Sequence, residues 1–84
     1  MSYKLIYTNT AYKDIEKLDI VAKKRIGKKI QEYSKDPLLS SKKLTNSSIG
    51  THRWRIGNYR VVFDIDKKNI VILRVGHRRE IYKY

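Results

Sequence analysis

Four short segments have the pattern of strands, and in three of them hydrophobic and polar positions alternate, as they do in strands that separate a packed face from a wet one. These segments are residues 3–8, 52–56, 59–65 and 70–75. The last is almost continuously apolar, which is typical of a strand at the centre of a sheet. Gly57-Asn58 and residues 66–69 carry the turn residues that would join the last three segments. We therefore predict one strand near the start of the chain and three consecutive strands near its end.

Between the first two strands the apolar spacing changes to that of two helices. The first is predicted from Thr10 onward, with Thr8 and Asn9 as candidate caps. The second follows Asp19, a good N-cap residue, and is stopped by Pro37. Their apolar stripes are Ala11, Ile15 and Leu18 in the first helix, and Ala22, Ile26, Ile30 and Tyr33 in the second.

Residues 37–50 are rich in Ser, Thr and Asn and show no sustained period, so they are predicted to be a connector. The order strand, helix, helix, strand, strand, strand indicates an α+β fold, βααβββ. In this fold the helical hairpin packs on one face of a small, mainly antiparallel sheet, and the other face stays open. We see no internal repeat and expect residues 1–84 to form a single domain.

The positive net charge of the chain indicates which class of partner it binds. Twenty Lys and Arg against eight Asp and Glu give a net charge of +12, which attracts polyanions and makes nucleic acid the leading partner class. No apolar run approaches the ~20 residues of a membrane-spanning helix, and the first residues lack the apolar core of a signal peptide. We therefore expect a cytoplasmic protein with no membrane partner. The absence of cysteine excludes disulfides and thiolate metal sites.

Arginine and lysine occupy different parts of the chain. Six of the seven arginines lie in residues 52–84, whereas ten of the thirteen lysines precede residue 51. Arg53 and Arg55 should share a sheet face with Arg60, across the Gly57-Asn58 turn. Cations gathered without carboxylates repel one another, so we expect an anion between them, and the guanidinium fork suits phosphate.

The second helix carries a basic face with two interpretations, a solvated helix face or a surface that docks on nucleic acid. Together with Arg79 near the end of the chain, the candidate RNA contacts are Lys23, Lys24, Arg25, Lys28 and Lys29.

Metal-free cleavage of RNA needs a base for the 2′-hydroxyl, cations for the phosphate and an acid for the leaving 5′-oxygen. His77 and Tyr82 follow the last strand, and neighbouring guanidinium groups would favour a phenolate at Tyr82. Two plainer interpretations stand beside this one, an ordinary surface histidine and a packing aromatic; His52 is interpreted as structural. Asp66 is a natural turn residue, and the carboxylates Asp64 and Glu80 are expected to pair with arginines. We expect neither a metal nor a cofactor.

The segments WRIGNYRVVFDID and RVGHRREIYK resemble the RelE/ParE toxin superfamily, and the ending is most similar to the RelE-like mRNA interferase branch. The resemblance covers nearly the whole chain. It implies a toxin of a type II toxin–antitoxin system, a metal-independent endoribonuclease that cuts mRNA in the ribosomal A site. Attack by the 2′-hydroxyl would leave a 2′,3′-cyclic phosphate, and translation would be inhibited.

The resemblance also implies a role for each matching residue. Arg53 and Arg55 occupy the positions of basic residues that contact the phosphate and help the proton transfers. Arg60 matches the arginine that stabilises transition-state charge, and Arg78 the one assigned to the phosphate or leaving group. Tyr82 matches the tyrosine that orients or activates the 2′-hydroxyl.

The chain departs from the RelE pattern at several of these positions. Arg53 and Arg55 replace lysines, and arginine is a poor proton donor. His77 replaces another lysine and is a candidate for the proton transfer, while Tyr84 is an alternative to Tyr82 as base.

The partners implied by the resemblance are a cognate RelB-like antitoxin, mRNA and the ribosome through small-subunit rRNA. Operator DNA would be reached only through the antitoxin complex. The antitoxin is expected to be acidic and to cover apolar surface with an amphipathic helix. Two alternatives remain: a ParE-like inhibitor of DNA gyrase without nuclease activity, and a non-catalytic nucleic-acid-binding module.

Overall fold

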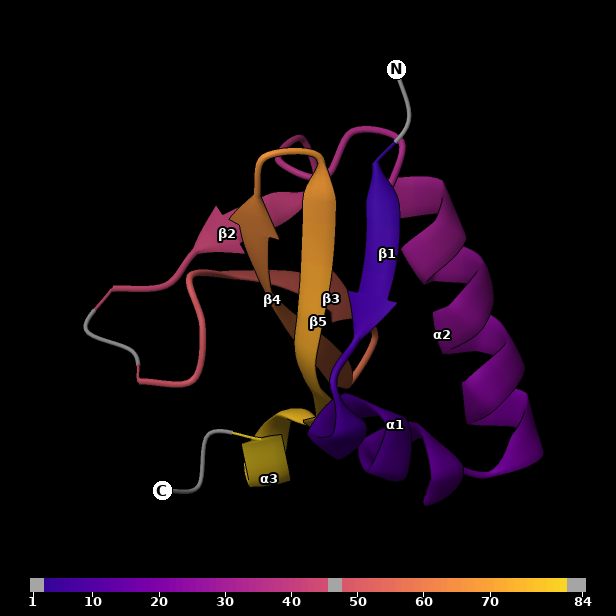
Figure 1. Ribbon diagram of the computed structural model, residues 1–84. Coiled ribbons are helices and arrows are strands. Elements are labelled where there is room, and N and C mark those ends of the chain that lie inside the picture. Colours follow the sequence, from indigo (N-terminus) through magenta and orange to yellow (C-terminus); the bar gives the residue numbers. More distant parts are fainter. Residues whose placement is uncertain (1–2, 46–47, 82–84) are drawn as a thin grey trace.

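The chain forms a five-stranded sheet with three helices in the computed structural model, which describes residues 3–45 and 48–81 (Figure 1). The elements are β1 (Lys4–Tyr7), α1 (Asn9–Glu16), α2 (Ile20–Tyr33), β2 (Ser41–Lys43), β3 (His52–Ile56), β4 (Tyr59–Asp66), β5 (Asn69–His77) and α3 (Arg78–Ile81). The predicted α+β order is confirmed. Two short elements that were not predicted, β2 and α3, are added to it.

Both long helices begin at side-chain caps that the sequence indicates. The hydroxyl of Thr8 accepts a hydrogen bond from the backbone N–H of Ala11 at 3.1 Å. The carboxylate of Asp19 accepts one from the N–H of Ala22 at 2.7 Å. Each bond satisfies an N–H group that has no partner within its helix. Asn9, the other candidate cap, is the first residue of α1.

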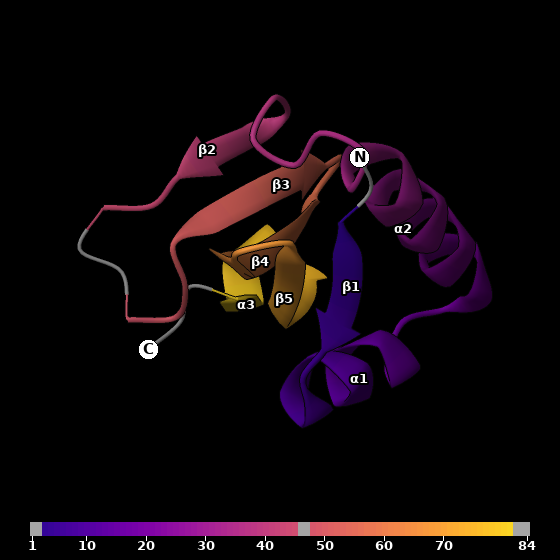
Figure 2. The same ribbon diagram turned by 45° about the horizontal axis from the view of Figure 1, so that its top comes forward.

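The strands lie in the order β1-β5-β4-β3-β2 (Figure 2). β1 pairs with β5 in parallel, and the other three pairings are antiparallel, so the predicted mainly antiparallel sheet is confirmed. The apolar strand β5 is paired on both sides, by β1 and β4. Ile70, Ile72 and Val75 of β5 are buried, and the half-buried Val71 and Leu73 between them are also apolar, so the apolar run is nearly continuous.

The predicted connector was wrong over residues 41–43, which form β2 and pair with β3 in antiparallel register. Its sequence, Ser-Lys-Lys, has no apolar position and therefore gives no alternating signal. The strand forms because the outer edge of β3 offers backbone N–H and C=O groups that need partners.

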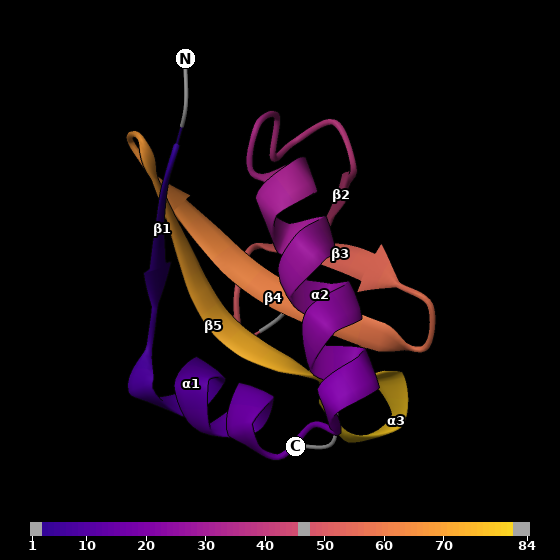
Figure 3. The ribbon, with the colours of Figure 1, turned by 90° about the vertical axis from the view of Figure 1, so that its right-hand side faces the viewer.

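α2 crosses one face of the sheet and encloses the core (Figure 3). Ile26 and Ile30 of α2 are each 1% exposed and pack with Trp54 and Phe63, whose ring centroids are 4.2 Å apart. The indole N–H of Trp54 donates to the carbonyl of Pro37 at 3.0 Å, so its one polar atom is satisfied inside the core. Trp54 and Phe63 are both fully buried.

α1 is joined to β5 by a partly buried ion pair. Nε of Arg74 lies 2.8 Å from Oδ2 of Asp14, and the same oxygen accepts the N–H of Val75 at 3.0 Å. Arg74 therefore supports the fold. In the described part of the chain, no helix is long and apolar enough to cross a membrane.

Candidate functional site

The β3–β4 hairpin brings three of the predicted site arginines to one face of the sheet. Arg55 is the register partner of Arg60, and Arg53 is the partner of Val62. Residues opposite one another on antiparallel strands point to the same face, so all three start from the face that α2 does not cover. The sequence-based prediction of a shared face is confirmed.

The three side chains have different environments. Arg55 is exposed and Arg53 is half-buried, but Arg60 is only 5% exposed. Nη1 of Arg60 donates to the carbonyl oxygens of Gly57 at 2.9 Å and Tyr59 at 2.8 Å. The prediction of an open face was therefore wrong for Arg60, because the carbonyl groups of the turn draw its guanidinium back over the hairpin.

The turn at the tip of this hairpin also fixes the start of α3. Gly57 has a φ of +60°, a conformation that suits glycine in a tight turn. The carbonyl of the next residue, Asn58, accepts the backbone N–H of Arg78 at 2.8 Å. Arg78 is exposed, and this bond places it beside the hairpin tip that carries Arg55 and Arg60. The structure thus brings these arginines from three elements to one end of the sheet.

His77 lies on the other face. It pairs with Tyr59, whereas its neighbour Gly76 pairs with Arg60, and successive strand residues alternate between faces. The rings of His77 and Tyr59 meet edge to face with centroids 5.9 Å apart. Nδ1 of His77 accepts the N–H of Arg79 at 3.2 Å. The structure does not bring the His77 ring together with the three hairpin arginines.

Of the remaining candidate residues at the end of the chain, only Arg79 lies among the described residues. Tyr82 and Tyr84, the two candidate bases, lie outside the described residues. Arg79 is exposed in α3, and Ile81 is 1% exposed and anchors that helix.

The residues interpreted as structural have local partners. His52 stacks on Phe63 with ring centroids 5.6 Å apart. Asp64, which was expected to pair with an arginine, instead accepts bonds from the N–H and hydroxyl of Thr51 at 2.8 and 2.9 Å. Among the described residues, no three His, Cys, Asp or Glu side chains lie close enough together to hold a metal ion.

The basic side chains of α2 do not all point the same way. Lys24 and Lys28 are exposed, and Lys29 forms an ion pair with Glu32 at 3.7 Å. Arg25 instead reaches the hairpin tip, where its guanidinium lies against Gly57. Lys23 is half-buried between α1 and α2. One hint of this division is visible in the sequence, where Arg25 is the single arginine among the lysines of the first half of the chain.

An apolar groove of about 290 Å³ runs between α1 and α2. Ile15, Leu18 and Ile26 form part of its lining, and Tyr12 is 61% exposed at its side. Tyr7 also lines it, and burial raises the pKa of the Tyr7 phenol above its usual value. This groove was not predicted from the sequence, since apolar positions that line a groove have the same helical spacing as core positions.

Known proteins resemble this chain over nearly its whole length. Residues 5–82 match the ParE toxin family of the type II toxin–antitoxin system parDE. The toxin RelG of Mycobacterium tuberculosis is 37% identical over 90 residues, covering 99% of each chain. The toxin RelE3 of Methanocaldococcus jannaschii is 33% identical over 85 residues, covering 96% of this chain and 97% of the relative.

Solved structures of toxins with similar names also superpose on this chain. The toxin–antitoxin complex RelBE2 of Mycobacterium tuberculosis contains a chain that superposes with a TM-score of 0.84 at 33% identity, covering 93% of this chain and 100% of the other. The isolated E. coli toxin RelE superposes with a TM-score of 0.74 at 26% identity, covering 96% and 92%. With the fold, the hairpin arginines and these likenesses together, the chain belongs to the RelE/ParE family and is a RelE-like toxin of a type II toxin–antitoxin system.

Proposed function

We propose that this toxin is a metal-independent endoribonuclease that cleaves mRNA in the ribosomal A site and so inhibits translation in the cytoplasm. The observation that carries the proposal is the gathering of Arg55, Arg60 and Arg78 at one hairpin tip. Arg60 is held there by two carbonyl groups, so its charge is fixed in place before a substrate arrives. The likeness to toxins named RelE and RelG supports the same branch.

In the proposed reaction the 2′-oxygen attacks the adjacent phosphorus, and the bond from phosphorus to the 5′-oxygen breaks. A 2′,3′-cyclic phosphate and a free 5′-hydroxyl result. Arg53 and Arg55 hold the phosphate, Arg60 stabilises the charge that builds on its oxygens, and Arg78 lies toward the leaving oxygen. Tyr82 takes the proton of the 2′-hydroxyl, with Tyr84 as the alternative base.

The proton for the leaving 5′-oxygen has a less obvious source. Arginine is a poor donor of protons, and His77 starts from the face opposite Arg60. We therefore assign this proton to a water molecule held by Arg78 rather than to His77. Replacement of His77 by alanine separates the two assignments, because only a direct acid would give a large loss of the cleavage rate.

The test of the activity is primer extension on a defined mRNA in a purified translation system, with and without ribosomes. Ribosome-dependent cuts are expected. A DNA gyrase supercoiling assay on the same protein examines the alternative, which the match to the ParE family favours. Intact mRNA with inhibited gyrase would replace the nuclease by a gyrase inhibitor.

We further propose a cognate RelB-like antitoxin as the partner of this chain, in keeping with the solved complexes of RelB with RelE. An acidic amphipathic helix of the antitoxin fits the groove between α1 and α2, because the groove is apolar and Lys23 lines it. The lysines Lys24 and Lys28 lie exposed on the same helix and favour acidic residues on the partner. Operator DNA is contacted only by the complex, through the antitoxin.

The basic surface, with Lys24 and Lys28 included, is also assigned to the ribosome. In this proposal Lys24, Lys28, Lys29 and Arg79 contact small-subunit rRNA, whose phosphates attract a chain of net charge +12. If these residues bind rRNA phosphates, the affinity for the ribosome should fall steeply as the salt concentration rises.

A further inference from the structure

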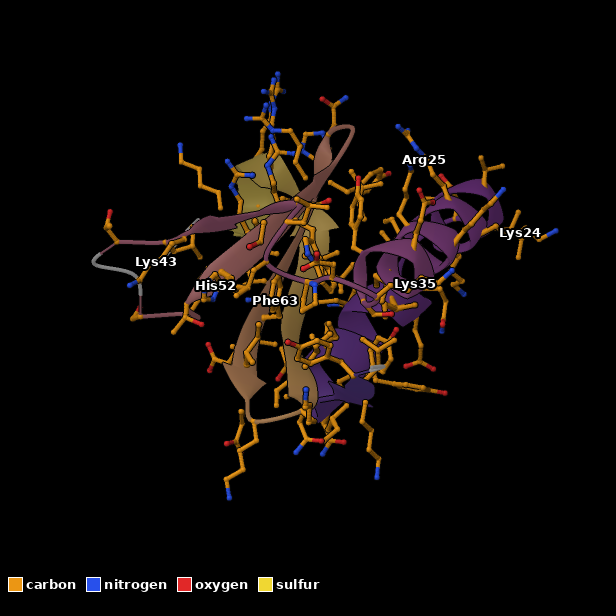
Figure 4. All side chains as sticks on the ribbon, turned by 90° about the horizontal axis from the view of Figure 1, so that it is seen from above. Lys24, Arg25, Lys35, Lys43, His52 and Phe63 are labelled. Carbon is orange, nitrogen blue, oxygen red and sulfur yellow. The ribbon has the colours of Figure 1, made fainter. Side chains whose placement is uncertain are left out.

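Arg25 lies against the tip of the β3–β4 hairpin although it belongs to α2. A Cβ atom built on Gly57 would lie 2.9 Å from Nη2 and 3.0 Å from Nη1 of Arg25. The missing side chain of Gly57 therefore leaves the room that the guanidinium occupies. Figure 4 shows that Arg25 and Lys24 leave α2 in different directions. The side chain of Arg25 remains exposed to solvent in this position.

Two guanidinium groups thus converge on one glycine. Nη1 of Arg60 lies 2.9 Å from the carbonyl oxygen of Gly57, and the guanidinium of Arg25 approaches the position of its absent Cβ. Because the Cβ position and carbonyl oxygen of one residue are close together, the two groups are separated by no more than about 9 Å. Arg25 comes from the side of α2, whereas Arg60 starts from the opposite face of the sheet.

Two guanidinium groups at this distance repel each other, so the pair does not stabilise the folded state. Within residues 3–45 and 48–81, no carboxylate forms an ion pair with Arg25. A chain of phosphates relieves the repulsion, since it brings one negative charge for each nucleotide. Arginine also suits this task better than lysine, because its planar fork donates two parallel bonds to phosphate oxygens.

We propose that Arg25 binds a backbone phosphate of the RNA substrate that flanks the phosphate held by Arg55, Arg60 and Arg78. The RNA strand then passes over the hairpin tip, from the open sheet face toward α2. This inference rests on the proposed function, because it extends the contact surface of the same RNA. Arg25 then contacts the RNA substrate, whereas the lysines of α2 do not take part in this contact.

The test measures binding of a short single-stranded 2′-O-methyl RNA oligonucleotide by fluorescence anisotropy over a range of salt concentrations. This probe lacks the attacking 2′-hydroxyl, so binding is measured without cleavage. The variants are Arg25→Ala, Arg25→Lys and the control Lys35→Ala. Lys35 is exposed just beyond the end of α2 and lies apart from Arg25 (Figure 4), and both alanine variants lower the net charge from +12 to +11.

For Arg25→Ala we expect the slope of log K against log salt to become shallower by about 0.7, the value for one phosphate on a single strand. The corresponding loss of affinity is about fivefold at 0.1 M salt. Arg25→Lys should recover most of the slope, and Lys35→Ala should keep the wild-type slope. A purely structural role of Arg25 would lower the melting temperature without changing the slope.

Equal slopes for wild type and Arg25→Ala, an equal loss in Lys35→Ala, or no binding of the probe by the wild type would each overturn the inference. Cleavage of mRNA is measured separately on the wild type. A wild type that binds the probe through Arg25 but cuts no mRNA refutes the proposed nuclease and leaves the phosphate contact standing, so the two failures are distinguishable.

Discussion

Arg55 and Arg60 face each other as register partners across the β3–β4 hairpin, yet the first is exposed and the second is 5% exposed. Like charges opposite one another on adjacent strands repel, and here Arg60 bends back to the turn carbonyls instead of extending beside Arg55. One arginine is therefore fixed by the fold, and the other is free to adjust to a substrate. This difference predicts different consequences when each is removed.

Arg60→Ala should lower both stability and cleavage. It leaves two turn carbonyls without this donor, which costs about 1–3 kcal/mol in the free energy of unfolding. It also removes a preorganised charge, so the cleavage rate of the folded variant should fall by about 100-fold. The exposed Arg55 gives the matched variant Arg55→Ala, whose stability should stay within about 0.5 kcal/mol of wild type. Chemical denaturation and cleavage rates check these effects; a folded Arg60→Ala protein that cuts at the wild-type rate contradicts the assignment.

Asp14→Ala should destabilise the fold by about 2–3 kcal/mol, because it leaves the half-buried guanidinium of Arg74 without its carboxylate. The side chains of Asp14 and Arg74 are only 10% and 23% exposed, so water replaces the lost partner poorly. Glu16→Ala removes the same charge from an exposed position of α1 and serves as the control, with an expected change below about 0.5 kcal/mol. Denaturant midpoints measure both. A cost for Asp14→Ala no larger than that of the control would show that the ion pair contributes little.

Two glycines should respond oppositely to alanine. A Cβ at Gly27 in α2 meets no described atom within 4 Å, so Gly27→Ala should stabilise the helix by about 0.5–1 kcal/mol. A Cβ at Gly50 would collide with Cγ1 of Val62, which is fully buried, so Gly50→Ala should destabilise by about 1–3 kcal/mol. Thermal melting of the two variants side by side provides the measurement, and shifts of the same sign would contradict the described packing.

The stability of the protein should fall with rising pH above about 10, in part because of Tyr7. Burial raises the pKa of its phenol in the folded state, so the unfolded chain releases this proton at a lower pH than the folded chain does. The contribution of Tyr7 is fully present below the unfolded pKa and is lost as pH rises through the folded pKa. Tyr7→Phe should flatten this decline when denaturant midpoints are compared between about pH 8 and pH 10.5. Identical declines in both proteins would exclude Tyr7 as the cause.

Tyr12→Glu should weaken antitoxin binding by at least about tenfold, because it sets a negative charge at the groove where an acidic helix is proposed to dock. Leu39→Glu is the control, since Leu39 is 80% exposed and does not line the groove. Calorimetry with the cognate antitoxin compares the two. Equal affinities would place the antitoxin elsewhere on the surface.

Much of this fold could be predicted from side-chain alternation and caps. The alternation over residues 52–56 gave β3 with its observed bounds, and Thr8 and Asp19 marked the starts of both long helices. These features are local, so neighbouring residues suffice to show them. β2 could not be predicted, because its pairing depends on the edge of β3 rather than on its own polar sequence.

The candidate site was predicted less completely, since its geometry depends on contacts between distant residues. Alternation correctly gave Arg53, Arg55 and Arg60 a shared face. It could not show that Arg60 returns to its own turn, or that Arg25 reaches the same turn from a helix. The roles of Arg53, Arg55, Arg60, Arg78 and Tyr82 in catalysis remain predictions.

The chemical identity of the cut RNA end tests the proposed nuclease activity most directly. Toxin is added to a ribosome-bound mRNA, and the 3′ end of the upstream fragment is identified by mass spectrometry. We predict a 2′,3′-cyclic phosphate for the wild type and a strong loss of this product for Arg60→Ala. A 3′-hydroxyl end, or no cut at all while DNA gyrase is inhibited, would contradict it.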